Sequence, residues 1–394
     1  MSYQAIKEYL VAIVSRYKKL DRKGKTALLN EATQVTKLSR KHLIRLLKQP
    51  EEVLAKKKSS GRRPKYPPEL LLPHLKFLWI QMERISGRRM KAAYVDWLPF
   101  YKHPEFTPQL RRLVEQMSAS TLERLLRKLR RDDRAGKGLS LTPEGCPSRY
   151  MKNKIPLNTF DAKIDRPGFF QADTVGHCGT STAGQFLYSI TLTDIDSTWT
   201  ENRAIFSKKA IGVRRQFADF DQSIPFEILA VNVDNGSEFI NNHMINFMRR
   251  ESGKKPITFT RSREYKKNDN CYVEQKNFTH VRELFGYDRM EDPRLVILMN
   301  EIYKTCWNPL QNFFIPTFKL KEKIRIGARI VKKFDAPQTP YDRLMKSNHL
   351  SDERKEALMK TKAKLNPLDL KVHLEEKLKI FFDELRKSKN REVS

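Results

Sequence analysis

The chain has 394 residues, of which 39% are hydrophobic, so it is long enough to fold into two to four domains with their own cores. Lys and Arg total 77 against 46 Asp and Glu, and the net charge of +31 indicates a polyanionic partner. No apolar run approaches the roughly 18–20 residues that span a bilayer, and the first residues lack the cleavage pattern of a signal peptide. We therefore expect a cytoplasmic protein that binds nucleic acid and no membrane.

Positive charge is concentrated in the first part of the chain. Residues 1–150 contain 34 Lys and Arg residues against 14 Asp and Glu residues, whereas the remaining 244 residues contain 43 and 32. A strongly basic front end joined to a more balanced body predicts DNA-binding modules followed by a catalytic part. The cysteines are widely spaced and form no CxxC pair, so we expect reduced thiols at Cys146, Cys178, Cys271 and Cys306.

Residues 1–55 are predicted to form a helix-turn-helix DNA-binding domain. In KTALLNEATQVTKLSRKHLIRLLK, residues 25–48, apolar residues recur every three or four positions, which is typical of amphipathic helices. A break near residues 35–38 separates two short helices, and Ser39 is a suitable N-cap for the second. The candidate DNA contacts on that second helix are Arg40, Lys41 and Arg45.

A second copy of this pattern occurs 79 residues later. SRKHLIRLLK at residues 39–48 and SASTLERLLR at residues 118–127 both fit S-x-x-x-L-x-R-L-L-[K/R]. In each copy the serine is placed to cap a helix, the leucines to pack inward and the polar face to meet a DNA groove. We therefore predict a second helix-turn-helix-like module over residues 69–135, with Arg124 and Arg127 facing DNA. The alternative is a pair of unrelated amphipathic helices that share a leucine rhythm.

Two segments have the composition of linkers. Residues 56–68, KKKSSGRRPKYPP, are basic, rich in Ser, Gly and Pro, and poor in apolar residues. This segment is either a linker alone or a linker that also enters a minor groove through Arg62 and Arg63. Residues 136–160 form the second predicted linker.

From residue 161 onward the pattern changes, and we predict an α/β catalytic domain over residues 161–315. Three segments rich in β-branched and aromatic residues predict antiparallel strands, and then helices alternate with two further strands. This is the element order of the ribonuclease H-like fold. The predicted strands span residues 168–177, 185–196, 197–206, 225–234 and 256–261, and the helices span 208–220, 237–250 with Ser237 as the cap, and a segment from residue 270 or 271.

Three acidic residues occupy positions that converge in this fold. Asp173 lies in the middle of the first strand, Asp234 at the carboxyl end of the fourth, and Glu274 one turn into the helix after the fifth. Clustered carboxylates repel one another unless a cation lies between them, and Mg²⁺ prefers such hard oxygen ligands. Singly, Asp234 also fits a turn and Glu274 a solvated helix, but together they predict a metal-dependent phosphoryl-transfer site. Asp194 and Asp196 are rival acids that we expect to be structural or to support the site.

Specific motifs surround these acids. FFQADTVGH surrounds Asp173, LTDIDSTWTE follows it, VNVDNGSEF surrounds Asp234 and YKKNDNCYVEQKNFTHVRELFGYDR surrounds Glu274. In these motifs the chain resembles insertion-sequence DNA transposases of the retroviral-integrase superfamily. The resemblance implies a catalytic Asp-Asp-Glu triad, two Mg²⁺ or Mn²⁺ ions bound by it, and recognition of the ends of a mobile element. The 39 residues between the second and third acids exceed the usual integrase spacing, and the integrase His-His-Cys-Cys zinc module is absent.

The helix that carries Glu274 offers further DNA contacts. Lys276, Asn277 and Arg282 lie on or near it and are placed to approach DNA phosphates. The alternative is an ordinary polar helix face.

The last part of the chain, residues 316–394, is predicted to be a small region of β and helical structure. It begins with a basic two-stranded segment at residues 319–334, which turns at Gly327 and is a further candidate for DNA contact. Residues 351–390 are predicted to form charged helices.

Together these features predict a DNA transposase that works as a homo-oligomer on DNA. Water frees a 3′-OH at the element end, and that 3′-OH then attacks target DNA, so bond energy is exchanged and no ATP is required. Two alternatives differ from this prediction. One is a non-catalytic, domesticated DNA-binding regulator, and the other is a ribonuclease H-like nuclease that cuts DNA but never joins it.

Overall fold

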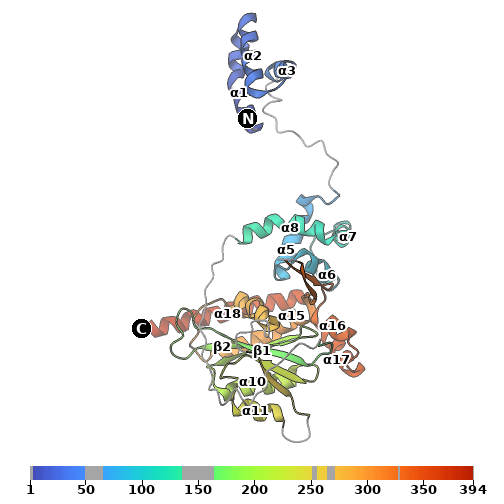
Figure 1. Ribbon diagram of the computed structural model, residues 1–394, viewed down its shortest axis with the longest axis vertical. Helices are drawn as coiled ribbons and strands as arrows, with labels where there is room; N and C mark the ends of the chain where they lie inside the picture. Colours follow the sequence, from blue (N-terminus) through green and yellow to red (C-terminus); the bar gives the residue numbers. More distant parts are fainter. Residues whose placement is uncertain are drawn as a thin grey trace. The chain divides into compact units, whose positions relative to one another are not determined.

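The computed structural model describes residues 3–48, 65–134, 164–250, 255–263, 271–326 and 329–393 (Figure 1). The chain divides into two compact units, Met1–Lys65 and Tyr66–Ser394. Most of the two predicted linkers, including Arg62 and Arg63, lies outside the described residues. None of the helices in the described ranges is long and apolar enough to cross a membrane.

The first unit is a three-helix module with a small apolar core. Its helices are α1 (Tyr3–Lys19), α2 (Arg22–Thr36) and α3 (Arg40–Lys48). Helix α2 ends because Lys37 adopts a left-handed conformation, with φ of 59°. The Ser39 hydroxyl then accepts a hydrogen bond from the His42 backbone N–H at 3.4 Å, as predicted for the cap of α3. Leu43 and Leu47 are fully buried, so the polar residues of α3 face outward.

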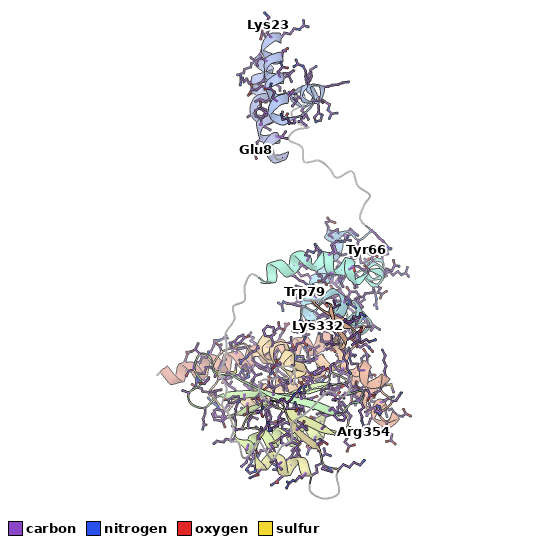
Figure 2. All side chains as sticks on the ribbon, in the orientation of Figure 1. Glu8, Lys23, Tyr66, Trp79, Lys332 and Arg354 are labelled. Carbon is purple, nitrogen blue, oxygen red and sulfur yellow. The ribbon has the colours of Figure 1, made fainter. Side chains whose placement is uncertain are left out.

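The second copy of the serine-leucine pattern folds in the same way. It lies in the second unit, at the start of the last of four helices, which are α5 (Pro68–Gln81), α6 (Gly87–Trp97), α7 (Pro108–Gln116) and α8 (Ala119–Arg134). The Ser118 hydroxyl accepts a hydrogen bond from the Thr121 backbone N–H at 3.1 Å, and Leu122 and Leu126 are fully buried. Trp79 of α5, labelled in Figure 2, donates its indole N–H to a backbone carbonyl inside this module.

These four helices share one unit with the rest of the chain rather than standing apart. The Trp97 indole N–H donates to the Phe314 carbonyl at 3.0 Å. Lys371 of the last helix forms an ion pair with Glu83 at 2.6 Å. Since the indole, Lys371 and Phe314 are all buried, these contacts join the 69–135 helices firmly to the sheet domain.

A five-stranded mixed sheet forms the centre of the second unit. The strand order is β3-β2-β1-β4-β5, in which β1–β2 and β2–β3 are antiparallel and β1–β4 and β4–β5 are parallel. The antiparallel pairing of the first three strands agrees with the prediction. The strands are β1 (Phe169–Gly176), β2 (Leu187–Asp194), β3 (Thr200–Phe206), β4 (Ala230–Val233) and β5 (Thr258–Arg261).

Helices cover both faces of the sheet, and Figure 1 shows α10 and α11 on one side with α15 and α18 on the other. Every residue of β4 is buried, as expected for a parallel strand covered on two faces. The helices are α10 (Ala210–Ser223), α11 (Asn242–Arg249), α12 (Cys271–Lys276), η2 (Asn277–Arg282, a π-helical stretch), α13 (Glu283–Phe285), α14 (Leu295–Ile302), η3 (Tyr303–Trp307) and α15 (Asn308–Phe314).

The remaining elements belong to the C-terminal region. A two-stranded antiparallel ribbon is followed by three helices, where the sequence predicted a basic two-stranded segment and charged helices. These elements are β6 (Leu320–Ile326), β7 (Arg329–Phe334), α16 (Pro340–Lys346), α17 (Asp352–Ala363) and α18 (Pro367–Val393).

The predicted fourth strand, residues 225–234, is shorter in the structure, Ala230–Val233, and two further predicted boundaries were wrong for local reasons. Ser237 does not cap the helix after β4, because residues 234–240 first form a turn, and Asn241 caps α11 by accepting from the Met244 N–H at 3.0 Å. The third strand begins at Thr200 rather than at residue 197, because the preceding residues turn around the Asp194 carboxylate.

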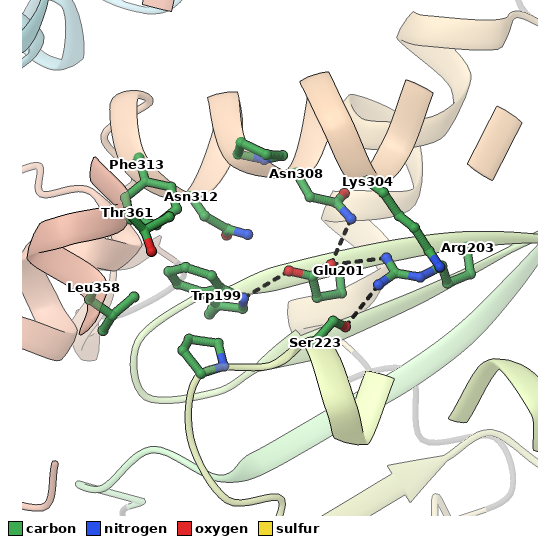
Figure 3. Close-up of a pocket in the computed structure, with 12 residues that line it drawn as sticks. Trp199, Glu201, Arg203, Ser223, Lys304, Asn308, Asn312, Phe313, Leu358 and Thr361 are labelled. Atoms are coloured by element: carbon green, nitrogen blue, oxygen red, sulfur yellow. Dashed lines mark hydrogen bonds and ion pairs between the residues drawn. The ribbon is translucent and has the colours of Figure 1, made fainter. Parts of the chain in front are cut away.

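Asparagine side chains protect the open edge of β3. Each amide accepts a hydrogen bond from a backbone N–H of β3 and donates one to the C=O of the same residue, as a neighbouring strand does. The pairs are Asn300 with Ala204, Asn308 with Asn202, and Asn312 with Thr200. Figure 3 shows Asn308 and Asn312 reaching from α15 toward the strand. An unprotected edge strand can pair with another chain, so this arrangement keeps β3 within its own sheet.

Asn312→Ala is expected to lower the melting temperature by about 5 °C, because a buried N–H and C=O of Thr200 lose their partners at a cost of about 2–3 kcal/mol. Both hydrogen bonds measure 2.9 Å and Asn312 is buried. Thermal unfolding followed by circular dichroism measures the change. Asn348→Ala, at an exposed loop position, is the matched control and should melt with the wild type. Equal melting of the two variants would show that Asn312 does not protect the strand.

Candidate active site

The sheet brings two of the predicted acids side by side. In the parallel pairing of β1 with β4, Ala172 lies opposite Val233. Asp173 follows Ala172 on β1, and Asp234 follows Val233 at the end of β4. Since neighbouring strands lie about 4.7–4.9 Å apart, continuing this register brings Asp173 and Asp234 beside each other at the end of β4. This juxtaposition of residues 61 positions apart follows from the strand register alone.

Asp173 is held by two hydrogen bonds. Its Oδ1 accepts from the Thr174 backbone N–H at 2.7 Å, and its Oδ2 accepts from the Asn277 side-chain amide at 2.5 Å. The Asn277 amide comes from the helix that carries Glu274, three residues earlier. One side chain therefore links the first predicted acid to the helix of the third.

The helix of Glu274 lies along β1. Gln171 caps its beginning, since the Gln171 side-chain oxygen accepts from the backbone N–H groups of Tyr272 and Val273 at 3.1 and 3.4 Å. Further along, Arg282 donates to the Gly176 carbonyl at 3.0 Å. The helix thus follows the strand over its length.

The rotation of this helix turns Glu274 outward. Val273 and Val281 are fully buried, and His280 is buried beside Trp307. Glu274 is exposed on the opposite side. Its carboxylate is therefore open to solvent, on a helix that Asn277 links to Asp173.

The turn after Asp234 is tight and holds a fourth acid. The Asp234 Oδ1 accepts from the Gly236 N–H at 3.0 Å. A Cβ added at Gly236 would lie 2.9 Å from that oxygen and 2.6 Å from Oε2 of Glu238, so a larger residue here would displace one of the two carboxylates. Glu238 is buried, with 3% of its surface exposed.

Glu238 connects this turn to the strand of Asp173. Its Oε1 accepts from the Thr174 hydroxyl at 2.7 Å and forms an ion pair with Lys208 Nζ at 2.5 Å. Thr174 follows Asp173, and neighbouring strand residues point to opposite faces, so Glu238 braces the site from the other face of the sheet. Sequence analysis did not select Glu238, although it stands four residues after Asp234 within the quoted VNVDNGSEF motif.

The residues present fit a divalent cation in part. Asp173 and Asp234 offer adjacent hard oxygen ligands of the kind that Mg²⁺ and Mn²⁺ prefer. Within the described parts of the chain, however, no three His, Cys, Asp or Glu side chains lie close enough together to hold a metal ion. The register therefore brings the first two acids to the end of one strand pair, and the three-acid metal site stays a prediction.

The residues predicted as DNA contacts on the helix of Glu274 are engaged with the protein. Asn277 and Arg282 hydrogen bond to β1, as described above. Lys276 is half-buried, and desolvation together with the nearby positive charges of Arg89 and Arg343 lowers its pKa to about 7. Contact of these three side chains with DNA stays a prediction.

The predicted contacts on α3 and α8 lie on exposed surfaces. Arg40 and Arg45 make local contacts with Asn30 and His42. All five predicted contacts on these two helices are exposed: Arg40, Lys41, Arg45, Arg124 and Arg127.

The two rival acids have structural partners. The buried Asp194 accepts hydrogen bonds from the backbone N–H groups of Gly168 and Phe169, and from the N–H and hydroxyl of Ser197. Burial raises the pKa of Asp194 to about 6. Asp196 forms an ion pair with Lys319. Both therefore organise the turn between β2 and β3.

A cavity of about 290 Å³ lies away from the acids, between β3 and α15. Figure 3 shows that polar residues lining the cavity bond to one another. The Glu201 carboxylate accepts hydrogen bonds from Trp199, Arg203 and Asn308. None of the predicted site residues lines it. We therefore place the candidate site at the paired aspartates and not in this cavity.

Comparison with known proteins identifies one close relative. An uncharacterized protein of Sinorhizobium fredii, y4rM, is 33% identical over 340 residues, which cover 85% of this chain and 94% of that protein. No family model matches the chain. The catalytic core domain of BIV integrase is similar at 19% identity with a TM-score of 0.27, covering 44% of this chain and 91% of that one. A simian T-cell lymphotropic virus intasome bound to PP2A regulatory subunit B56 gamma is similar at 13% identity with a TM-score of 0.24, covering 43% and 54%. Both TM-scores are too low to support a conclusion.

Proposed function

The chain belongs to the family of the Sinorhizobium fredii protein y4rM, and we propose that it is a metal-dependent DNA transposase that cuts and joins DNA strands. The observation that carries the proposal is the placement of Asp173 opposite Asp234, with the helix of Glu274 fastened to Asp173 through Asn277. A strand-interior aspartate beside a second carboxylate is costly unless a cation or a hydrogen bond compensates it.

Each residue has a distinct task in this proposal. Asp173 and Asp234 hold a divalent cation, and the exposed Glu274 completes its ligands on DNA. When bound, Mg²⁺ or Mn²⁺ activates the attacking oxygen and stabilises the leaving oxygen of an in-line displacement. Asn277 fixes the orientation of the Asp173 carboxylate, since its amide donates to Oδ2. Glu238 holds the Asp234 turn in place.

The proposed reaction has two steps, hydrolysis and strand transfer, and the second step conserves the number of phosphodiester bonds. Water first attacks a phosphodiester at the element end, and the bond between phosphorus and the 3′ oxygen breaks. A proton from the water ends on that oxygen, which leaves as a 3′-OH. That 3′-OH then attacks a target phosphodiester, whose own 3′ oxygen leaves. The new bond replaces the broken one, so no nucleotide cofactor is required.

DNA recognition is assigned to the two serine-capped helices. Helix α3 presents Arg40, Lys41 and Arg45, and helix α8 presents Arg124 and Arg127, on faces opposite their buried leucines. Phosphate contacts supply affinity, and contacts to base edges supply specificity. Two element ends must be held together, so a homo-oligomer on DNA is part of the proposal.

Strand transfer in vitro tests the proposal. The substrate is a labelled duplex that carries the inverted repeat flanking the gene, incubated with plasmid DNA and Mg²⁺. We expect a nick at the repeat end and labelled plasmid, both dependent on the divalent cation. Cutting without joining would support the nuclease alternative, and binding that neither cuts nor responds to Mg²⁺ would support a non-catalytic regulator.

A further inference from the structure

An exposed aromatic ring lies on the helical segment that continues from Glu274 and is linked to Asp173 through Asn277. Phe278 retains 47% of its surface exposed to solvent, although it lies in a helix whose opposite side is fully buried. It follows Glu274 by four residues, and residues four apart lie on the same face of a helix. The ring therefore projects on the side of the helix that presents the third acid.

The helix cannot rotate to bury this ring. Gln171 fixes the first turn, Asn277 is bonded to Asp173, and Val273 and Val281 are packed in the core. Turning Phe278 inward would break these contacts. The stretch from residue 277 to 282 is π-helical, a widened geometry that is frequent at functional sites.

The residues around Phe278 favour a flat ligand, such as a nucleobase, over a protein surface as the partner of its ring. Along the exposed side of the helix its neighbours Glu274, Gln275 and Thr279 are polar, so they form no continuous apolar patch with it. Protein–protein contacts usually require such a patch. A single ring among polar groups, on a chain with a net charge of +31, matches one unpaired nucleobase held by its phosphate backbone.

We propose that Phe278 stacks on an unpaired base of the DNA strand bound at the active site, which positions the neighbouring phosphate for attack. The proposal rests on the proposed function and adds a base-binding residue to it. Stacking on an aromatic side chain is independent of base identity, because every base has a π face. Phe278 therefore contributes to the choice of frayed or unpaired DNA and not to the reading of sequence.

Two labelled DNA probes test the proposal without catalysis. One is a blunt duplex, and the other is the same duplex with an unpaired 3′ overhang of thymidines. Affinities of the full chain are measured by fluorescence anisotropy in EDTA. We expect the wild type to bind the overhang probe about tenfold more tightly than the blunt probe. Phe278→Ala should remove this preference and leave the affinity for blunt DNA unchanged.

Three further variants define the contact. Phe278→Trp should keep the preference, because it keeps an aromatic face, and Phe278→Leu should lose it although the side chain stays apolar. Ile297→Ala, at a position 72% exposed on α14, should bind as the wild type does. An unchanged preference in Phe278→Ala or in Phe278→Leu overturns the stacking proposal. A wild type that binds blunt DNA without preferring the overhang also overturns it, whereas a wild type that binds neither probe overturns the proposed function as well.

Discussion

Asp234→Asn is expected to reduce strand cleavage by about three orders of magnitude or more, as removal of a group at the reacting centre does in other enzymes. The asparagine side chain keeps the size of the aspartate and an oxygen for the Gly236 N–H, so the turn should survive. It removes one of the two adjacent charges that would bind the cation. Asp173→Asn should have the same effect, because Asp173 lies opposite Asp234 across the strand pair. Gel assays of end cleavage in Mg²⁺ measure both.

Thermal unfolding separates lost chemistry from lost structure. In EDTA the two variants should melt at or slightly above the wild-type temperature, because one of two neighbouring like charges is gone. Added Mg²⁺ should raise the melting temperature of the wild type and of Asp288→Asn, an exposed acid outside the site, but not of either variant. A wild-type cleavage rate, or an equal response to Mg²⁺, in Asp234→Asn would remove these aspartates from the catalytic role.

Local pattern was sufficient to predict the sheet and its two aspartates. The strand of Asp173 is rich in aromatic and β-branched residues, and the strand before Asp234 is nearly continuously apolar, so each segment predicts its own place in a mixed sheet. Handedness and short connections then leave few ways to join five such strands. The position of the two acids follows from that topology without knowledge of any side-chain contact.

Side chains whose importance comes from distant partners were not predictable in this way. Gln171 accepts from a helix N–H 101 residues later, and Asn312 bonds to a strand 112 residues earlier. Neither residue type has a periodic pattern that indicates its partner. Glu238 stood within a quoted motif, but its burial between Thr174 and Lys208 depends on how three separate elements meet.

The ion pair of Glu238 with Lys208 is expected to be asymmetric. The side chain of Glu238 is 2% exposed and that of Lys208 is 35% exposed. Lys208→Gln therefore leaves a buried carboxylate without its cation, at a cost of about 3 kcal/mol in unfolding free energy. Glu238→Gln should cost about 1 kcal/mol, because the lysine returns to water and the Thr174 hydrogen bond can still form. Urea unfolding of the single and double variants measures these differences.

The cleavage rates should rank the two variants in the opposite order to their losses of stability, with Glu238→Gln slower than Lys208→Gln. This difference separates a positioning role of Glu238 from a purely structural one. Glu238→Gln weakens the brace on the Asp234 turn, and a small displacement at a reacting centre is expected to cost about tenfold in rate.

The double variant, Glu238→Gln with Lys208→Gln, should lose less stability than the sum of the two single variants, because the buried charge has been removed together with its partner. That double variant should still cleave as slowly as Glu238→Gln alone, since neutral side chains restore stability without restoring the charged anchor. Additive losses of stability, or a Glu238→Gln protein that cleaves at the wild-type rate, would show that this pair fills space beside Asp234 without holding it in place.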